Sequence, residues 1–340
     1  MNIRYKVYNL PFKHPFTISR GTKTHQPSLV VELEHFGIKG YGEAPAITYY
    51  NITVEQMISD IEAKRPFLER FAFMDPERYW HYLHHLFPSN PFLVCALDMA
   101  GWDIYGKMKK KQLHQLWNPV PSKNILTDIT IGIDEVEVMV QKMKEKPWPV
   151  YKIKLGTEKD VEIIEELRKH SSAIFRIDAN GGWETEEALN KINLFKDMGV
   201  ELIEQPLNKD NIEGMKMLFE KSALPLIADE SCVKESDVEK CNGYFHGINI
   251  KLTKCSGLTP ARRMIQKARD IGLHIMVGSM NESMVGTSAM AQLLPLIDYA
   301  DMDGPLLLSE DICEGLHFEY GNISYSNSFG IGLVNTENII

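Results

Sequence analysis

The chain lacks the features of a membrane-spanning or disulfide-rich protein. No apolar run approaches the roughly 18 residues of a transmembrane helix, and the N-terminal MNIRYKVYNLPFKHPF has no apolar core of a signal peptide. The five cysteines are an odd number without CxxC spacing, which favours reduced thiols over disulfides or a zinc knuckle. We therefore expect a cytoplasmic protein that does not cross a membrane.

Basic charge is also scarce. The formal net charge is −9, and the one basic run, Lys107 to Lys111, follows an apolar helical stretch and is explained as a solvated helix end. This argues against a nucleic-acid partner, which would require basic patches. A hydrophobic content of 44% over 340 residues is typical of a globular enzyme with two domains, or with one large barrel and additions.

Three zones of periodicity follow one another along the chain. Residues 1–50 alternate apolar and polar positions, as antiparallel strands do, and residues 53–116 show helical periodicity. After NPVPSKN, eight short apolar runs alternate with amphipathic helical stretches, which predicts a parallel β/α barrel. A doubly wound open sheet is the alternative, but no glycine-rich phosphate loop follows the early strands.

The segment VYKIKLG places Lys152 and Lys154 on one face of a strand that is otherwise apolar. Snorkelling surface lysines are the simple explanation. However, charged residues recur 22–26 residues apart near the ends of successive apolar runs, at Lys154, Asp178, Glu204, Asp229 and Lys251. This spacing is about one β/α unit, so these charges should meet at the carboxyl ends of the barrel strands, where such barrels have their active sites.

The three carboxylates Asp178, Glu204 and Asp229 would converge there, and hard oxygen ligands of this kind suit Mg2+. Three separate capping carboxylates are the alternative. Lys154 and Lys251 would flank the metal as two bases that remove and return an α-proton beside a carboxylate, through an ene-diolate. Lys152 would assist by its charge and by contacting the substrate carboxylate. The pattern therefore predicts racemisation or epimerisation.

With these residues, the chain resembles the enolase superfamily and its muconate-lactonizing-enzyme subgroup. The motifs are GYGEA, ALDMAGWDIYGK, KIK, RIDANGGW, IEQP, ADES, NIKLTKCSG and GSMNES. The resemblance implies an α/β fold, with a modified TIM barrel (β/α)7β over residues 121–310 and an α+β capping domain of residues 1–120 joined by 311–340. It also implies one Mg2+ per subunit and a homo-oligomer.

The resemblance further implies a substrate. In dipeptide epimerases of this subgroup an Asp-x-Asp on the eighth strand holds the substrate ammonium, and Asp301 and Asp303 in DMDGP match it. A simple turn motif is the alternative. Arg20 and Lys23 fall in the matching capping loop, where a cation would suit a dipeptide such as Ala-Glu from murein, and Glu282 in GSMNES is expected to contact substrate.

Other functions remain open on the same scaffold: a lactonizing enzyme, an o-succinylbenzoate synthase, an N-acylamino acid racemase, or a binding protein without catalysis. A second candidate metal site is formed by His81, His84 and His85, at helical spacing in WHYLHHLF. Because no acidic partner follows as in HExxH, we interpret these histidines as helix packing.

Overall fold

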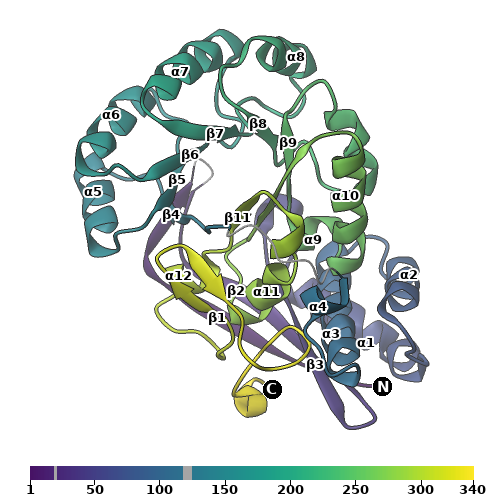
Figure 1. Cartoon of the computed structure of the whole chain (residues 1–340). Coiled ribbons are helices and arrows are strands. Elements are labelled where there is room, and N and C mark those ends of the chain that lie inside the picture. The colour runs from purple at the N-terminus through teal and green to yellow at the C-terminus, as the bar shows by residue number, and fades with distance from the viewer. Residues whose placement is uncertain (19–20, 118–124) are drawn as a thin grey trace.

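The structure is a computed structural model and describes residues 1–18, 21–117 and 125–340. Its first part is an antiparallel sheet of order β1-β2-β3 with helices packed on it, drawn purple to blue in Figure 1. The strands are β1 (Asn2–Ile18), β2 (Gly21–His35) and β3 (Ile38–Pro45). The helices are α1 (Val54–Arg70), α2 (Pro76–Leu86), α3 (Pro91–Met108) and α4 (Leu113–Trp117), after a 3-10 turn at Thr48–Tyr50.

Helix α3 lies directly on strand β3. It begins where the Asn90 side chain accepts a hydrogen bond from the Leu93 N–H, with Pro91 in the first turn. A Cβ on Gly40 or Gly42 would stand 2.2 or 1.9 Å from a backbone oxygen of α3, so only glycine allows this approach. The GYGEA motif therefore sets how closely the capping sheet and its central helix pack.

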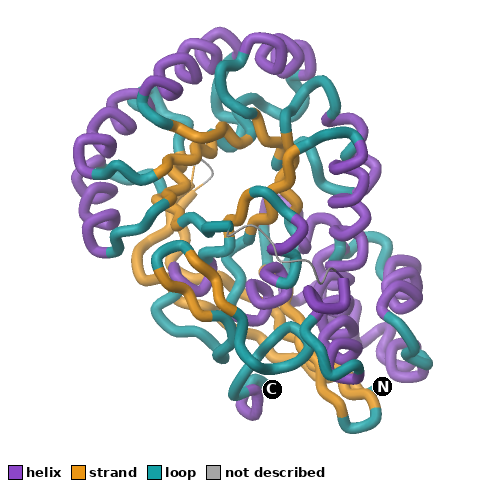
Figure 2. Tube along the Cα trace, in the orientation of Figure 1, coloured by secondary structure: helices purple, strands orange, loops and turns teal. Residues whose placement is uncertain are grey.

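The second part is a parallel barrel, seen in Figure 2 as a ring of strands inside a ring of helices. Its strands are β4 (Ile129–Ile131), β5 (Val150–Lys154), β6 (Ile174–Asp178), β7 (Val200–Glu204), β8 (Leu226–Ala228), β9 (Gly247–Ile250), β10 (His274–Gly278) and β11 (Tyr299–Asp301). The helices are α5 (Val136–Glu145), α6 (Asp160–His170), α7 (Thr185–Asp197), α8 (Ile212–Lys221), α9 (Leu252–Cys255), α10 (Leu258–Asp270), α11 (Met284–Ala291) and α12 (Gly304–Leu307). Two 3-10 turns, Glu235–Asp237 and Glu239–Cys241, connect β8 to β9.

The register of the strands brings the predicted charges into one layer. Lys154 pairs with Asp178, and Asp178 pairs with Glu204, so all three lie at the carboxyl ends of β5, β6 and β7. The ladder runs in order from β4 to β11, and an isolated bridge between Thr127 and Ala300 joins its two ends. The prediction of a modified TIM barrel with a capping domain is confirmed.

The C-terminal tail contacts both parts. It contains a small hairpin of β12 (His317–Glu319) and β13 (Asn322–Ser324) and a 3-10 turn at Thr336–Asn338. The Tyr8 hydroxyl of β1 donates to the Ile339 carbonyl at 2.6 Å, whereas the Tyr325 hydroxyl donates to Ala291 of the barrel at 2.8 Å. The domain boundaries near residues 120 and 310 stay a prediction.

Among residues 1–18, 21–117 and 125–340, no helix has both the length and the hydrophobicity of a membrane span.

Candidate active site

A cavity of about 490 Å³ lies between the capping sheet and the carboxyl ends of the barrel strands. The capping side contributes Phe16, Lys23 and Tyr50, and the barrel side contributes both predicted bases, Lys154 and Lys251. Since every barrel strand ends at this face, side chains from distant parts of the sequence meet here.

The two predicted bases stand on different strands and contact different carboxylates. Lys154 Nζ lies 2.5 Å from Asp178 Oδ2. Lys251, the residue after β9, donates to the Ser279 carbonyl at 3.1 Å and lies 3.7 Å from Asp229 Oδ2. Both side chains are at least nine-tenths buried. This burial contradicts a surface strand with snorkelling lysines.

Each of the three predicted metal ligands has one oxygen fixed by the protein scaffold. Asp178 Oδ1 accepts from the Asn180 N–H at 2.9 Å, and Glu204 Oε1 accepts from Asn249 Nδ2 at 2.8 Å. Asp229 Oδ1 accepts from Lys254 Nζ at 2.6 Å. The carboxylate planes are thereby oriented by the scaffold, as outer partners orient metal ligands.

The second oxygen of each carboxylate faces lysine ammonium groups. Lys152 Nζ lies 3.4 Å from Asp178 Oδ2 and 2.7 Å from Glu204 Oε2, and the geometry of the Glu204 contact is that of an ion pair without an aligned hydrogen bond. A buried carboxylate oxygen without an aligned donor can accept a cation. Glu204 Oε2 is such an oxygen, and with Asp178 Oδ2 and Asp229 Oδ2, which contact Lys154 and Lys251, it forms an all-oxygen donor set that fits Mg2+. The assignment of these ligands stays a prediction.

Negative charge is crowded in this layer, and the pKa values reflect it. Burial raises the pKa of Glu204 to about 7, and the charges of Asp178 and Asp229 add to that effect while Lys152 opposes it. Burial alone would raise the pKa of Asp229, but the ammonium groups of Lys251 and Lys254 outweigh it and lower the pKa. Burial would lower the pKa of Lys251, yet Asp229 raises it above the usual range. Any further cation is therefore favoured here.

The Asp-x-Asp pair lies beside this layer, at the end of β11. Asp301 Oδ2 lies 2.8 Å from Lys152 Nζ, and Asp303 Oδ2 accepts from the Thr130 N–H at 2.6 Å. Burial raises the pKa of Asp303 to about 6, with Asp301 adding to it. The pair and Lys152 line the cavity.

A second acidic cluster involves the same pair. Oxygen atoms of Asp128, Asp301 and Asp303 lie within 4.8 Å of one another, and all three side chains are buried. A cation could be held here as well as at the predicted triad. Asp301 and Asp303 border the cavity, and Asp301 contacts the Lys152 ammonium.

The remaining predicted contacts are Arg20, Lys23 and Glu282. Arg20 falls outside the described residues. Lys23 lines the cavity, and its Nζ donates to Gln26 Oε1 at 3.1 Å. Glu282 is buried behind the loop at the end of β10, where it accepts from the Met280 N–H, and burial together with Glu43 raises its pKa to about 8. Its predicted contact with substrate stays a prediction.

The three histidines of α2 are exposed, and their interpretation as helix packing stays a prediction. The His84 ring stacks on Trp80 with centroids 4.9 Å apart, and His85 Nδ1 lies 2.7 Å from the His81 carbonyl.

The sequence reasoning missed several residues of the site. Asn249 stands two residues before Lys251, and Arg176 stands two before Asp178, so the alternation seen in Lys152 and Lys154 would have revealed both. Lys254 follows Lys251 by three residues, on the first turn after the strand. No pattern in the sequence indicated that Lys254 would contact Asp229.

Three similar proteins illustrate the comparison with known proteins. The L-Ala-D/L-amino acid epimerase of Flavobacterium johnsoniae is 52% identical over 98% of this chain and 99% of its own. A substrate-liganded L-Ala-D/L-Glu epimerase of Bacillus subtilis has a TM-score of 0.92 at 28% identity, covering 98% of both chains. A dipeptide epimerase of Cytophaga hutchinsonii complexed with Mg and D-Ala-L-Val has a TM-score of 0.92 at 26% identity, covering 99% of this chain and 97% of its own.

The family models cover most of the chain. Residues 3–117 match the mandelate racemase/muconate lactonizing enzyme N-terminal domain, and residues 135–338 match the enolase C-terminal domain-like family. The predicted family resemblance is confirmed, and so is the racemase/epimerase class of its relatives. The chain belongs to the mandelate racemase/muconate lactonizing enzyme family of the enolase superfamily.

Proposed function

We propose that this protein is a Mg2+-dependent dipeptide epimerase that inverts the α-carbon of the C-terminal residue. The observation that carries the proposal is a cavity lined by two buried lysines, Asp229 and a separate carboxylate pair, with Asp178 and Glu204 held against its lysines. Dipeptide epimerases with the same fold, over 97% or more of both chains, support the substrate class.

Asp178, Glu204 and Asp229 would hold the metal through the oxygens that the scaffold leaves facing the lysines. When bound, Mg2+ supplies positive charge beside the substrate carboxylate, which makes the adjacent α-proton more acidic. Lys152 adds a further cation at that position, because its Nζ lies among Asp178, Glu204 and Asp301.

Lys154 and Lys251 exchange the proton. The neutral amine of one lysine takes the α-proton from one face, and the ammonium of the other gives a proton to the opposite face. The reverse direction uses the same two groups with their roles exchanged. One proton is removed and one is added, so the product differs from the substrate only in configuration.

Asp301 and Asp303 receive the N-terminal ammonium of the dipeptide. They line the cavity beside the predicted metal ligands, since the Lys152 ammonium contacts both Asp301 and Glu204. An ammonium in a closed cavity needs anionic acceptors. This geometry favours a free amino terminus over an N-acyl group.

The side chain of the C-terminal residue faces the capping domain. Phe16, Ile18 and Ile47 offer apolar surface, and Lys23 offers one cation. Such a lining accepts several side chains, with a mild preference for a carboxylate such as that of Glu. L-Ala-L-Glu is therefore our reference substrate.

The decisive experiment is incubation of L-Ala-L-Glu and N-acetyl-L-Ala-L-Glu in heavy water with Mg2+, followed by mass spectrometry and chiral analysis. We expect deuterium at the C-terminal α-carbon together with epimerisation of the free dipeptide. Turnover of the acetylated compound at the same rate would favour an N-acylamino acid racemase. Loss of the α-proton with elimination would favour an o-succinylbenzoate synthase.

We also propose that residues 1–120 with 311–340 form the capping domain, that residues 121–310 form the catalytic barrel, and that the enzyme is a cytoplasmic homo-oligomer. Hydrogen bonds join the tail to β1 of the capping sheet, through Tyr8, and to helix α3, through Asp103, and they support the first point. Light scattering coupled to size-exclusion chromatography would measure the oligomeric state.

A further inference from the structure

The barrel closes at a seam between β4 and β11 that is held chiefly by side chains. Beyond the backbone bridge of Thr127 with Ala300, Thr127 Oγ1 accepts from the Met302 N–H at 2.8 Å. The Thr130 N–H donates across the same seam to Asp303. The residues that would receive the substrate ammonium are thus located on the barrel's closing strand and the segment just after it.

Arg176 links this seam to the opposite wall. Its Nη1 donates to Asp128 Oδ2 and to the Ala300 carbonyl, both at 2.9 Å, and its Nε donates to Glu201 at 2.7 Å. The Ala300 carbonyl precedes Asp301 directly. The guanidinium therefore fixes the backbone next to the first aspartate of the pair.

Asp128 accepts a hydrogen bond from the buried Arg176 guanidinium and balances part of its charge. It is fully buried, and its Oδ1 has no hydrogen-bond partner among the described residues. A carboxylate oxygen of Asp128 lies within 4.8 Å of oxygens of Asp301 and Asp303. Without Asp128, Glu201 would be the one carboxylate among the described residues that is hydrogen-bonded to Arg176.

We infer that Asp128, acting through Arg176, is a positioning residue that tunes the Asp301–Asp303 pair for a cationic amino terminus. Asp128 neutralises Arg176, so that the guanidinium holds β11 without repelling the ammonium. The Lys152 ammonium already lies 2.8 Å from Asp301, so with an unbalanced guanidinium as a second cation the two carboxylates would discriminate poorly between a free and an acylated amine.

This inference rests on the proposed epimerisation of dipeptides with a free amino terminus. The test variant is Asp128→Asn, which keeps the side-chain volume and removes the charge. For wild type and variant, kcat and KM are measured at pH 8 with L-Ala-L-Glu and its N-acetyl derivative. We expect KM for the free dipeptide to rise about tenfold or more, since a buried charge partner is lost. We expect kcat to change by less than about threefold because the bases are untouched.

The ratio of kcat/KM values between the two substrates separates this role from a merely structural one. A structural defect would lower kcat/KM for both substrates by the same factor and leave their ratio unchanged. Asp98→Asn is the matched control: Asp98 is also fully buried, but it accepts from Thr259 between α3 and α10, so this variant should keep the ratio. An unchanged ratio in Asp128→Asn overturns the inference.

If Asp128→Asn does not fold, Arg176→Lys replaces it. Lysine keeps the charge but lacks the planar set of donors that binds Asp128, Glu201 and the Ala300 carbonyl together. The ratio of kcat/KM for the free dipeptide to kcat/KM for the acetylated one should therefore fall in this variant, as in Asp128→Asn. An unchanged ratio in this variant also overturns the inference. A wild-type enzyme that does not distinguish the two substrates refutes the proposed function itself.

Discussion

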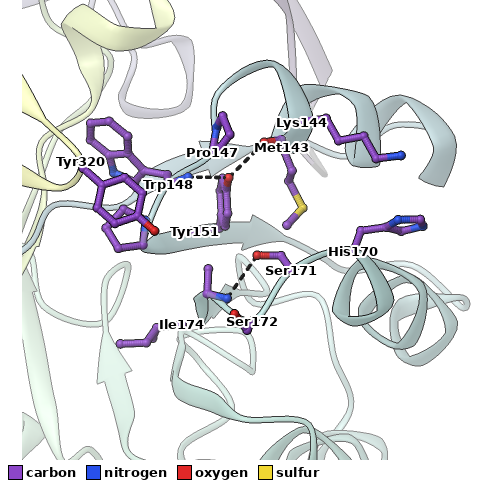
Figure 3. A pocket seen from close by; sticks show the side chains of 12 residues that line it. Met143, Lys144, Pro147, Trp148, Tyr151, His170, Ser171, Ser172, Ile174 and Tyr320 are labelled. Carbon is purple, nitrogen blue, oxygen red and sulfur yellow. Dashed lines mark hydrogen bonds between the residues drawn. The ribbon is translucent and has the colours of Figure 1, made fainter.

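The two ends of the barrel carry cavities of similar size and opposite chemistry. The cavity at the carboxyl ends of the strands measures about 490 Å³, and the one at the amino ends of β5 and β6 measures about 440 Å³. Figure 3 shows the second, where Trp148 and Tyr320 stand together and Tyr151 joins the backbone by hydrogen bonds. Its twelve lining residues include no carboxylate.

Cavity volume therefore does not indicate which end of the barrel holds the candidate active site, whereas buried charge does. At the amino end the Tyr151 hydroxyl accepts from the Trp148 N–H at 2.8 Å and donates to the Lys146 carbonyl at 2.9 Å, so its bonding capacity is used within the fold. At the carboxyl end, the lysines and carboxylates of the candidate active site are buried. Burying them costs stability, which is expected where chemistry requires them.

Removal of the metal should have the largest effect. Dialysis against EDTA is expected to reduce epimerisation to background, and Mg2+ should restore it, because the lysines alone would not supply the divalent charge that makes the α-proton of the substrate acidic. Asn249→Ala, which frees Glu204 Oε1, should weaken Mg2+ affinity about 10- to 100-fold. Full activity of the chelated enzyme would exclude Asp178, Glu204 and Asp229 as ligands of an essential metal.

Loss of either base should have the next largest effect. Lys154→Ala and Lys251→Ala should each lower epimerisation by about 10²–10⁴-fold or more. One variant is still expected to exchange the α-proton of a single epimer with heavy water, because the other base remains. Lys240→Ala, on the surface beside Asp237, is the control. Near-normal epimerisation by both variants would place the bases elsewhere.

The carboxyl end should also carry a pH-dependent loss of stability. Burial raises the pKa of Glu282 to about 8, so the folded state binds its proton more tightly than the unfolded state. The free energy of unfolding should therefore fall as pH rises from about 4.5 to about 8, by at most about 1.4 kcal/mol per pH unit from this group.

Urea unfolding between pH 5 and 8 would measure this dependence. Glu282→Gln should flatten the slope, and the exposed control Glu55→Gln should not. An identical slope in wild type and Glu282→Gln would show that another group carries it.

Recognition of the amino terminus should have a smaller effect. Acetylation of L-Ala-L-Glu is expected to cost the wild-type enzyme at least about 2 kcal/mol in transition-state binding, the range for loss of a buried charge partner. In Asp301→Asn the penalty should be much smaller, because the carboxylate that distinguishes the two substrates is gone. Steady-state kcat/KM values for both enzymes with both substrates give the coupling energy between the Asp301 carboxylate and the substrate amino group. An equal penalty in both enzymes would remove Asp301 from substrate recognition.

The barrel and its charged layer could be predicted from the sequence because the β/α unit repeats along the chain, with a charged residue near the end of each strand. One β/α unit has a nearly constant length, so Lys154, Asp178, Glu204, Asp229 and Lys251 could be aligned without any structure. The contacts that orient them could not. Lys254 reaches back to Asp229 across 25 residues, and Glu43 of the capping sheet accepts from Ser283 of the barrel across 240. Such contacts depend on packing between elements, which no local period encodes.

The smallest effect is expected at the amino end. Tyr151→Phe removes the hydroxyl that receives the Trp148 N–H and leaves that buried donor unpaired, at a cost of about 1–3 kcal/mol in the free energy of unfolding. Because the site lies at the other end of the barrel, kcat/KM should stay within about twofold of wild type. Tyr320→Phe, at a residue that is 60% exposed, is the control and should change stability by less than about 0.5 kcal/mol. Urea unfolding and steady-state kinetics on the same preparations separate the two quantities. A tenfold loss of kcat/KM in Tyr151→Phe would mean that the aromatic cavity acts on the charged one through strand β5, and the two ends could no longer be treated as independent.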